Sequence, residues 1–289
     1  MKNARVFAAK FFMNSFKSKT SFLSTFFFGY SSIYFLQKSY YSRAISLEDN
    51  TNSNKIAEFF EKVDSQEIMS KFNNLTVLSS KAVENLMGLI RDKEISIEQF
   101  RLYSRRIMRF IIEETLALEC DKEVIKEAPL GYYKTRINRR HDNDYVAISI
   151  LRSGNSMVDE LLSIMPGINV GNILIQRDEN THEKKAIFYF EKLPDNLKDK
   201  RILLLDPMLA TGGSASAAIE ILKSKGVKEE NIIFLNFVSC VEGIEIMFNK
   251  YPKMKIVTSQ VDPLLLPNKY IGPGLGDFGD RYYGTMNKE

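Results

Sequence analysis

Apolar runs rich in β-branched residues alternate with helical stretches along the second half of the chain. The runs predict strands at residues 147–151, 172–176, 186–190, 202–206, 231–238 and 255–261. Helices are predicted between several of them, at residues 157–165, 214–225 and 243–250. Strands that are apolar on both faces and alternate with helices form a mainly parallel sheet that helices cover on both sides. The sequence therefore predicts an α/β fold, in which a ligand binds beyond the carboxyl ends of the strands.

A long amphipathic helix is predicted before the first of these strands. Ser96 and Gln99 form the capping-box pattern that is typical of a helix start. Apolar residues then recur at helical spacing, at Phe100, Tyr103, Ile107 and Ile111. The pattern indicates a helix with one continuous apolar face.

The first 53 residues differ in composition from the rest of the chain. They are basic, rich in Ser and Phe, and contain no acidic residue before Glu48. Residues 20–37, TSFLSTFFFGYSSIYFLQ, carry no charge. This composition is typical of a mitochondrial targeting segment. A membrane anchor is a weaker alternative because of the many hydroxyl side chains in the uncharged run, and a tail without a targeting role is a third.

The chain is therefore divided into an N-terminal extension and linker, residues 1–53, and a domain, residues 54–289. With 44% hydrophobic residues the chain can build a sizeable core. We expect a cytoplasmic or mitochondrial location, with membrane anchoring less favoured.

Charge and cysteine content argue against several classes of protein. The net charge is +4, and the basic excess lies mostly before Glu48, so the remaining chain is slightly acidic. A basic surface for nucleic acid is therefore not expected. Cys120 and Cys240 lie far apart, and His141 and His182 have no ligand-like neighbours. Neither a disulfide scaffold nor a zinc site is expected.

The segment RILLLDPMLATGGSASAAIEILKSKGV at residues 201–227 joins a buried strand to a helix through a turn of small residues. A strand that ends at Asp206 delivers this carboxylate to the ligand-binding edge of the sheet. In the turn, glycines let an anion approach the backbone N–H groups and hydroxyls add donors. These turn residues are Thr211, Gly212, Gly213 and Ser214. Because a carboxylate repels phosphate but binds sugar hydroxyls, the combination predicts a ribose 5-phosphate site, with a plain strand–turn–helix junction as the alternative.

Several stretches together resemble the uracil phosphoribosyltransferase family. They are LLLDPMLATGGSA at 203–215, ILRSG at 150–154, QRDENT at 176–181, KLPDNL at 192–197 and YIGPGLGDFGDRYYGT at 270–285. The stretch NLTVLSSKAVENLMGLIRDKEIS at 74–96 resembles the opening segment of the family. The resemblance covers about residues 75–285, and Pro207 after Asp206 matches the variant of the phosphoribosyl motif that this family carries.

The resemblance implies a phosphoribosyltransferase-type α/β fold. Its mainly parallel sheet would be flanked by helices, with a hood or arm at the active site and an N-terminal helical segment. The charged stretch at residues 178–192 is expected to form a hairpin arm. This arm would either cover the site or reach a neighbouring subunit.

By the same resemblance, the chain binds 5-phosphoribosyl 1-diphosphate (PRPP). Arg152 and Arg177 would face the diphosphate, and each follows an apolar strand, where a planar guanidinium suits diphosphate oxygens. Asp277 would point to PRPP and its Mg²⁺, without a direct protein ligand to the metal being assigned. The ribose and 5-phosphate would be held by Asp206, Pro207, Met208, Leu209, Ala210, Thr211, Gly212, Gly213 and Ser214.

The Gly/Pro-rich loop at residues 272–276 suggests how a base is chosen. Uracil presents acceptor, donor and acceptor groups along one edge, which a rigid backbone can match with N–H, C=O and N–H. By resemblance, Ile271, Gly276 and Phe278 supply these backbone contacts, with Asp277 beside them. Cytosine would place a donor where the site expects an acceptor, and an unpaired buried polar group costs about 1–3 kcal/mol.

The implied reaction is attack of uracil N1 on C1′ of PRPP, which yields UMP and diphosphate. Arg152, Asp206 and Asp277 would be the catalytic residues, acting mainly through positioning and charge stabilisation, and no general base is assigned. The alternative is a non-catalytic relative that binds uridine nucleotide. Expected partners are the substrates and products and further copies of the chain, as a homodimer or larger homo-oligomer. Regulation by GTP stays open, and no nucleic acid is expected.

Overall fold

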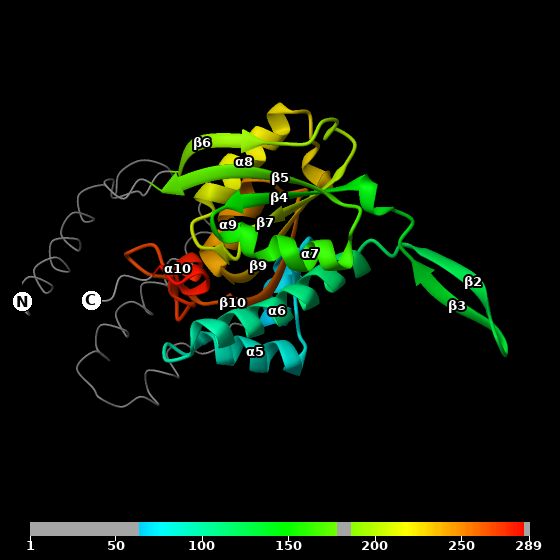
Figure 1. The fold of residues 1–289 in the computed structure, drawn as a ribbon, viewed down its shortest axis with the longest axis horizontal. Helices are drawn as coiled ribbons and strands as arrows, with labels where there is room; N and C mark the ends of the chain where they lie inside the picture. The colour runs from blue at the N-terminus through cyan, green and yellow to red at the C-terminus, as the bar shows by residue number, and fades with distance from the viewer. Residues whose placement is uncertain (1–63, 178–185, 286–289) are drawn as a thin grey trace, which may run out of the picture. The chain divides into compact units, whose positions relative to one another are not determined.

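The computed structural model describes residues 64–177 and 186–285, and one eight-stranded sheet lies at its centre (Figure 1). The spatial order is β1, β10, β9, β7, β4, β5 and β6, with β8 paired beside β9. Neighbouring strands run parallel, except that β5 and β6 are antiparallel. The bounds are β1 Leu75–Val77, β4 Tyr145–Leu151, β5 Asn169–Arg177, β6 Ala186–Lys192, β7 Arg201–Leu205, β8 Met208–Leu209, β9 Ile232–Cys240 and β10 Lys255–Asp262.

The predicted strands are all present, each with its bounds within three residues of the prediction. The mainly parallel sheet is therefore confirmed. The strand predicted at 202–206 ends one residue earlier, at Leu205, so Asp206 directly follows it. Residues 186–192 of the predicted hairpin arm form β6, which pairs with β5, whereas residues 178–185 lie outside the described part of the chain.

Helices flank the sheet, and two of them form the predicted N-terminal helical segment of the domain. The helices are α4 Ser65–Lys71, α5 Lys81–Arg91, α6 Ile97–Ala117, α7 Val158–Ile164, α8 Gly213–Ser224, α9 Val241–Lys250 and α10 Phe278–Tyr283. The long predicted helix is α6, and its capping box is formed. The Ser96 hydroxyl accepts a hydrogen bond from Gln99 N at 3.3 Å, and Gln99 Oε1 accepts one from Ser96 N at 3.4 Å.

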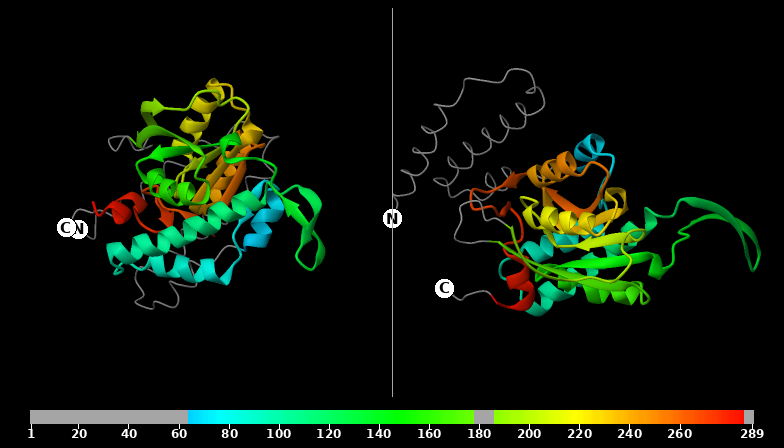
Figure 2. Two further views of the ribbon diagram at one scale, coloured as in Figure 1. Left: turned by 45° about the vertical axis from the view of Figure 1, so that its right-hand side comes forward. Right: turned by 90° about the horizontal axis from the view of Figure 1, so that it is seen from above.

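Alternate residues of the central strands face two separate cores. In β7, Leu203 and Leu205 pack with α5, α6 and α7, whereas Ile202 and Leu204 pack with α8 and α9. Helices therefore cover both faces of the sheet, as the two views of Figure 2 show. Burial of these apolar side chains is the main favourable term in folding, and it explains why the strands read as almost continuous apolar runs.

Two smaller sheets complete the fold. One is the hairpin of β2 (Lys122–Ala128) and β3 (Gly131–Ile137), and the other pairs β11 (Leu264–Leu265) with β12 (Ile271–Gly272). The β2–β3 hairpin, which the sequence analysis does not predict, projects from the sheet and its helices (Figures 1 and 2). Its residues are mostly exposed on both faces, so the sequence lacks the alternation of apolar and polar residues that marks a half-buried strand.

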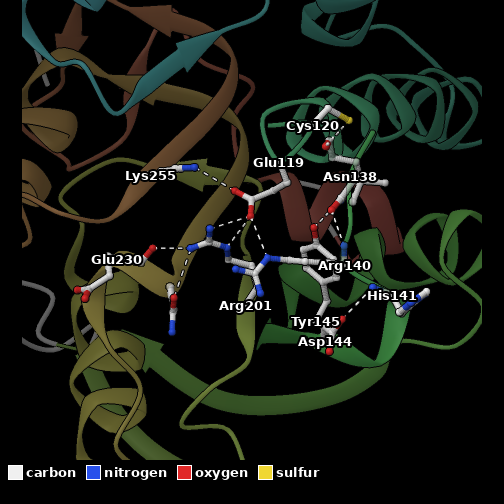
Figure 3. A network of polar contacts seen from close by, with 12 residues as sticks. Glu119, Cys120, Asn138, Arg140, His141, Asp144, Tyr145, Arg201, Glu230 and Lys255 are labelled. Atoms are coloured by element: carbon white, nitrogen blue, oxygen red, sulfur yellow. Dashed lines mark hydrogen bonds and ion pairs between the residues drawn. The ribbon is translucent and has the colours of Figure 1, made fainter. Parts of the chain in front are cut away.

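A polar network joins α6 to the amino ends of the strands (Figure 3). The buried Glu119 carboxylate accepts hydrogen bonds from Arg201 Nε at 2.8 Å and Lys255 Nζ at 3.0 Å, and Arg140 Nε lies 3.4 Å from Glu119 Oε2. Burial by itself raises the pKa of Glu119, but the hydrogen bonds from Lys255 and Arg201 outweigh it and lower this pKa. Since β7 and β10 begin at Arg201 and Lys255, the network lies at the sheet edge opposite the carboxyl ends.

The predicted N-terminal extension, residues 1–53, lies outside the described residues. Across residues 64–177 and 186–285, no helix combines the length and the apolar character that a membrane-spanning segment needs.

Candidate active site

An open pocket of about 660 Å³ lies at the carboxyl ends of β4, β5 and β7. Its volume suits a small-molecule ligand. The predicted site residues that line it are Arg152, Asp206, Met208, Ala210, Ser214, Ile271, Gly276, Asp277 and Phe278. Three segments that are far apart in the sequence therefore meet in one pocket.

The loop after β7 is held by β9 on both sides of Asp206. Asp206 N donates to Leu235 O at 3.3 Å, and Pro207 O accepts from Phe237 N at 2.8 Å. The two residues of β8, Met208 and Leu209, then pair with β9. This anchoring places Asp206 at the pocket wall and leads the chain towards the start of α8.

The start of α8 has the geometry of an anion site. The N-cap, Gly212, has φ +73° and offers no side chain to cap this helix. A Cβ at Gly212 would lie 2.8 Å from Met247 Sδ, so a side chain does not fit there. Thr211 Oγ1 accepts from Gly213 N at 3.4 Å, and Ser214 lines the pocket. Backbone N–H groups at such a helix start, together with the helix dipole, favour a negatively charged ligand.

Cys240 supports this loop from behind. Its thiol donates to Ala210 O at 3.1 Å and is fully buried. Burial raises the pKa of Cys240 to about 12, so the thiol stays protonated at neutral pH. Cys240 is therefore a packing residue and not a nucleophile.

The guanidinium of Arg152 is held by the C-terminal segment. Arg152 Nη2 donates to Asp280 Oδ1 at 2.5 Å, Nη1 donates to Thr285 Oγ1 at 3.0 Å, and the group lies 5.4 Å from the centre of the Tyr283 ring. The hydrogen bond from Thr285 and the ion pair with Arg152 lower the pKa of Asp280. The sequence analysis missed Asp280 and Thr285, although both lie in the stretch GDRYYGT that carries the resemblance.

Arg177 is the last residue of β5, three positions beyond the residue paired with Leu151. Its side chain lies outside the described structure. The neighbouring strand β6 contributes Ile187 and Tyr189 to the pocket lining. The described part of the arm therefore lines the pocket, and both roles expected of the arm stay predictions.

The C-terminal loop also contributes residues to the pocket lining. Ile271 lies in β12 and pairs with Leu265, and Gly276 and Asp277 follow a short turn. Asp277 Oδ1 accepts from Asp280 N at 2.9 Å and caps α10. The lining also includes Lys269, a cation that the sequence analysis missed because no motif or strand end marks it.

The ring of Phe278 belongs to the core. Its centroid lies 5.0 Å from that of Phe237, 5.3 Å from that of Phe100 and 5.7 Å from that of Tyr282. The residue is 2% exposed although it also contributes to the pocket wall. The ring therefore fixes the start of α10, which suits the expectation that Phe278 meets the base through its backbone.

Two carboxylates in the pocket are suited to bind a Mg²⁺ ion that is already coordinated by a substrate diphosphate. Within the described ranges, no three His, Cys, Asp or Glu side chains cluster as a metal site. Asp206 and Asp277 nevertheless line the same pocket. Mg²⁺ is commonly held by one or two carboxylates together with substrate phosphates and water. The donor set is therefore compatible with Mg²⁺ bound to a diphosphate.

Comparisons with known proteins identify the family. A sequence model described as uracil phosphoribosyltransferase matches residues 77–285. The chain is 43% identical over 218 residues to the uracil phosphoribosyltransferase of Dictyostelium discoideum, across 75% of this chain and 99% of that protein. It is 40% identical over 219 residues to the uracil phosphoribosyltransferase of Saccharomyces cerevisiae, across 73% of this chain and 97% of that protein.

Among solved structures, the AQ2163 protein of Aquifex aeolicus has a TM-score of 0.63 and 29% identity, across 74% of this chain and 100% of that one. The predicted α/β fold class and the predicted enzyme class, a pentosyltransferase, are confirmed by these matches, which do not favour a non-catalytic relative. The chain belongs to the uracil phosphoribosyltransferase family.

Proposed function

We propose that this pocket transfers the phosphoribosyl group of PRPP to N1 of uracil and releases UMP and diphosphate. The observation that carries the proposal is the meeting of three features in one pocket. They are Asp206 after a buried strand, the start of α8 with its glycine N-cap, and Arg152 beside the C-terminal loop. Each feature suits a different part of the two substrates.

The ribose 5-phosphate occupies the loop between β7 and α8. Its phosphate accepts hydrogen bonds from the first N–H groups of α8, and Thr211 and Ser214 add hydroxyl donors. The Asp206 carboxylate accepts hydrogen bonds from the ribose hydroxyls, because an ionised carboxylate is an acceptor only. The other loop residues, Pro207, Met208, Leu209, Ala210, Gly212 and Gly213, give the loop its shape.

We assign Arg152 to the leaving diphosphate, and for Arg177, at the end of β5, the same role rests on the family resemblance alone. The Arg152 guanidinium is already oriented at the pocket by Asp280 and Thr285. A preoriented positive charge stabilises the negative charge that develops on diphosphate as its bond to C1′ breaks. Mg²⁺ would be held through Asp206 and Asp277, and when bound with PRPP it supplies further neutralisation of the diphosphate charge.

Uracil lies against the C-terminal loop, where the backbones of Ile271, Gly276 and Phe278 pair with its polar edge and Asp277 lies beside it. The N1–C1′ bond forms as the bond between C1′ and the diphosphate oxygen breaks, and the ribose ring carries positive charge in the transition state. The N1 proton is released to water, with no general base assigned. Holding both reactants in one pocket makes the step effectively unimolecular.

The β2–β3 hairpin supports a homo-oligomer. Ile125 is 68% exposed, Leu130 102% and Tyr132 75%, on a two-stranded element that projects from the sheet (Figure 1). An isolated hairpin is marginally stable in water, and apolar side chains gathered on it favour a protein partner. A second copy of the chain is the partner that we propose.

We propose that the N-terminal extension, residues 1–53, directs the protein to mitochondria, because its composition is typical of a targeting segment. Fusing these residues to a fluorescent reporter tests this role. Mitochondrial fluorescence is the expected result, and a uniformly cytosolic signal would contradict it.

The proposed reaction is tested by incubating the protein with labelled uracil, PRPP and Mg²⁺ and identifying the product. UMP should form in proportion to enzyme and time, and replacing uracil by cytosine should abolish most of the product. Failure to form UMP from uracil in a folded protein would contradict the proposal.

A further inference from the structure

An arginine–aspartate ion pair lies behind the C-terminal loop. Arg91 is the last residue of α5, and Asp262 is the last residue of β10. Arg91 Nη2 donates to Asp262 Oδ1 at 2.6 Å, and Nη1 donates to Oδ2 at 2.9 Å. The two side chains are 18% and 2% exposed. This is a two-point, largely buried contact of the kind that fixes geometry as well as charge.

The same ion pair binds both polar backbone groups of Gly274. Gly274 N donates to Asp262 Oδ2 at 2.9 Å, and Gly274 O accepts from Arg91 Nη1 at 2.7 Å. Gly274 has φ +61°, and a Cβ there would lie 2.2 Å from Ile271 O. The turn at Gly274 is therefore specified by the absence of a side chain and by two hydrogen bonds to one ion pair.

A second arginine holds the next residue of the loop. Arg281 Nη1 donates to Leu275 O at 2.9 Å, and Nη2 donates to Asp92 O at 2.5 Å. Its guanidinium also lies 4.4 Å from the centre of the Phe100 ring. The carbonyls of two consecutive loop residues are thus bound by arginines, and both connections lead to the end of α5.

The loop residues that the two arginines and Asp262 hold are not the loop residues that line the pocket. Gly274 and Leu275 are bound from behind, whereas Ile271, Gly276 and Asp277 line the pocket. Backbone groups that recognise a ligand have fixed chemistry, so their selectivity depends on where the chain is placed. Groups that bind a ligand must be held within about 0.5 Å of the productive geometry to give full affinity.

We propose that Arg91 and Asp262 are positioning residues that set the affinity and selectivity of the site for uracil. The inference rests on the proposed function, because uracil is assigned there to the C-terminal loop. The ion pair touches no substrate itself. It fixes the peptide groups on each side of Gly274, so that backbone groups before and after it, at Ile271, Gly276 and Phe278, meet the acceptor–donor–acceptor edge of the base.

The test uses Arg91→Lys in the full chain, with steady-state UMP formation measured against each substrate. Lysine keeps the charge but lacks the planar guanidinium group, which hydrogen-bonds to Asp262 and to Gly274 O at the same time. The KM for uracil should rise about tenfold or more, and the KM for PRPP should rise by a much smaller factor, because Asp277 is its only assigned contact in this loop. The preference for uracil over cytosine, measured as the ratio of kcat/KM values, should fall with it.

Arg105→Lys is the matched control. Arg105 also binds a buried carboxylate, that of Glu160 on α7, but it makes no contact with the loop within the described residues. This variant should keep both KM values and the base preference. If Arg91→Lys does not fold, Arg281→Lys tests the same inference through Leu275 O, with a rise in the uracil KM of about threefold or more.

The outcomes separate this inference from the proposed function. A selective rise in the uracil KM in Arg91→Lys or Arg281→Lys supports the inference. Equal changes in both KM values, or a lower melting temperature with unchanged constants, would overturn it while UMP formation by the wild type still supports the proposed function. A wild-type protein that forms no UMP would overturn both.

Discussion

Arg152 Nη2 donates a 2.5 Å hydrogen bond to Asp280 Oδ1, which ties the end of β4 to α10 beside the pocket that Arg152 lines. Thr285 contacts both groups, at 3.0 Å from Arg152 Nη1 and 2.6 Å from Asp280 Oδ1. An arginine held in this way loses less conformational entropy when it meets an anion. The carboxylate therefore orients the guanidinium that we assign to the diphosphate.

Asp280→Asn should weaken PRPP binding without changing uracil binding. The amide keeps the size of the side chain but loses the charge that orients Arg152, so the KM for PRPP should rise about three- to tenfold. Initial rates at varied PRPP and at varied uracil measure the two effects separately. A fall in the KM for PRPP would mean that the carboxylate competes with the diphosphate for Arg152.

Phe278→Leu should lower stability and leave base preference unchanged. The ring packs against Phe237, Phe100 and Tyr282 in the core, and its loss should cost about 1–3 kcal/mol of unfolding free energy. Chemical denaturation measures this cost, and the kcat/KM ratio for uracil and cytosine measures preference. An unchanged unfolding free energy with an altered ratio would place the ring against the base.

Leu130→Asp combined with Tyr132→Asp should dissociate the proposed oligomer. Charged side chains on the exposed hairpin would be desolvated in an interface, a cost of several kcal/mol if they stay unpaired. Light scattering coupled to size exclusion gives the mass of each species. Leu102→Asp is the control, because Leu102 on α6 is 55% exposed and lies away from the hairpin. A wild-type protein that is monomeric at micromolar concentration would rule out the proposed interface.

Acid should destabilise the fold through Glu119. Hydrogen bonds from Lys255 and Arg201 outweigh burial and lower its pKa in the folded protein below the ordinary value of 4.5. The ionised carboxylate therefore adds stability that is fully present above about pH 5 and is lost as the pH falls through the folded-state pKa.

Glu119→Gln should lower the melting temperature at pH 7 and flatten its fall below pH 5. The cost at pH 7 should stay below the roughly 3–5 kcal/mol typical of a fully buried pair, because Lys255 is 30% exposed. Thermal unfolding from pH 3 to pH 8 measures both effects, with Glu94→Gln, at a side chain that is 79% exposed, as the control. Parallel curves for wild type and Glu119→Gln would show that another group controls acid unfolding.

The sheet could be predicted from the sequence because its central strands are buried on both faces. Runs such as ILLL and NIIFLNFV have few alternatives to a covered parallel sheet. Asp206 and Arg152 were predictable for the same reason, since residues that follow parallel strands meet at one edge. The expected role of Arg177 at the diphosphate stays a prediction.

The contacts that position the site could not be predicted, because they join residues far apart in the chain. Arg91 meets Asp262 across 171 positions, and Arg152 meets Asp280 across 128. An arginine at a helix end or an aspartate at a strand end gives no local sign of its partner. The β2–β3 hairpin was missed because exposure on both faces leaves no periodic pattern in its sequence.

Asp206→Asn tests whether this pocket holds PRPP by its ribose and transfers the phosphoribosyl group to uracil. A charged hydrogen bond contributes roughly 1.5–3 kcal/mol, so kcat/KM for PRPP should fall about ten- to hundredfold. The measurement pairs UMP formation with thermal unfolding for wild type and variant. We expect reduced turnover at an unchanged melting temperature, whereas full activity of the variant would contradict ribose binding by Asp206.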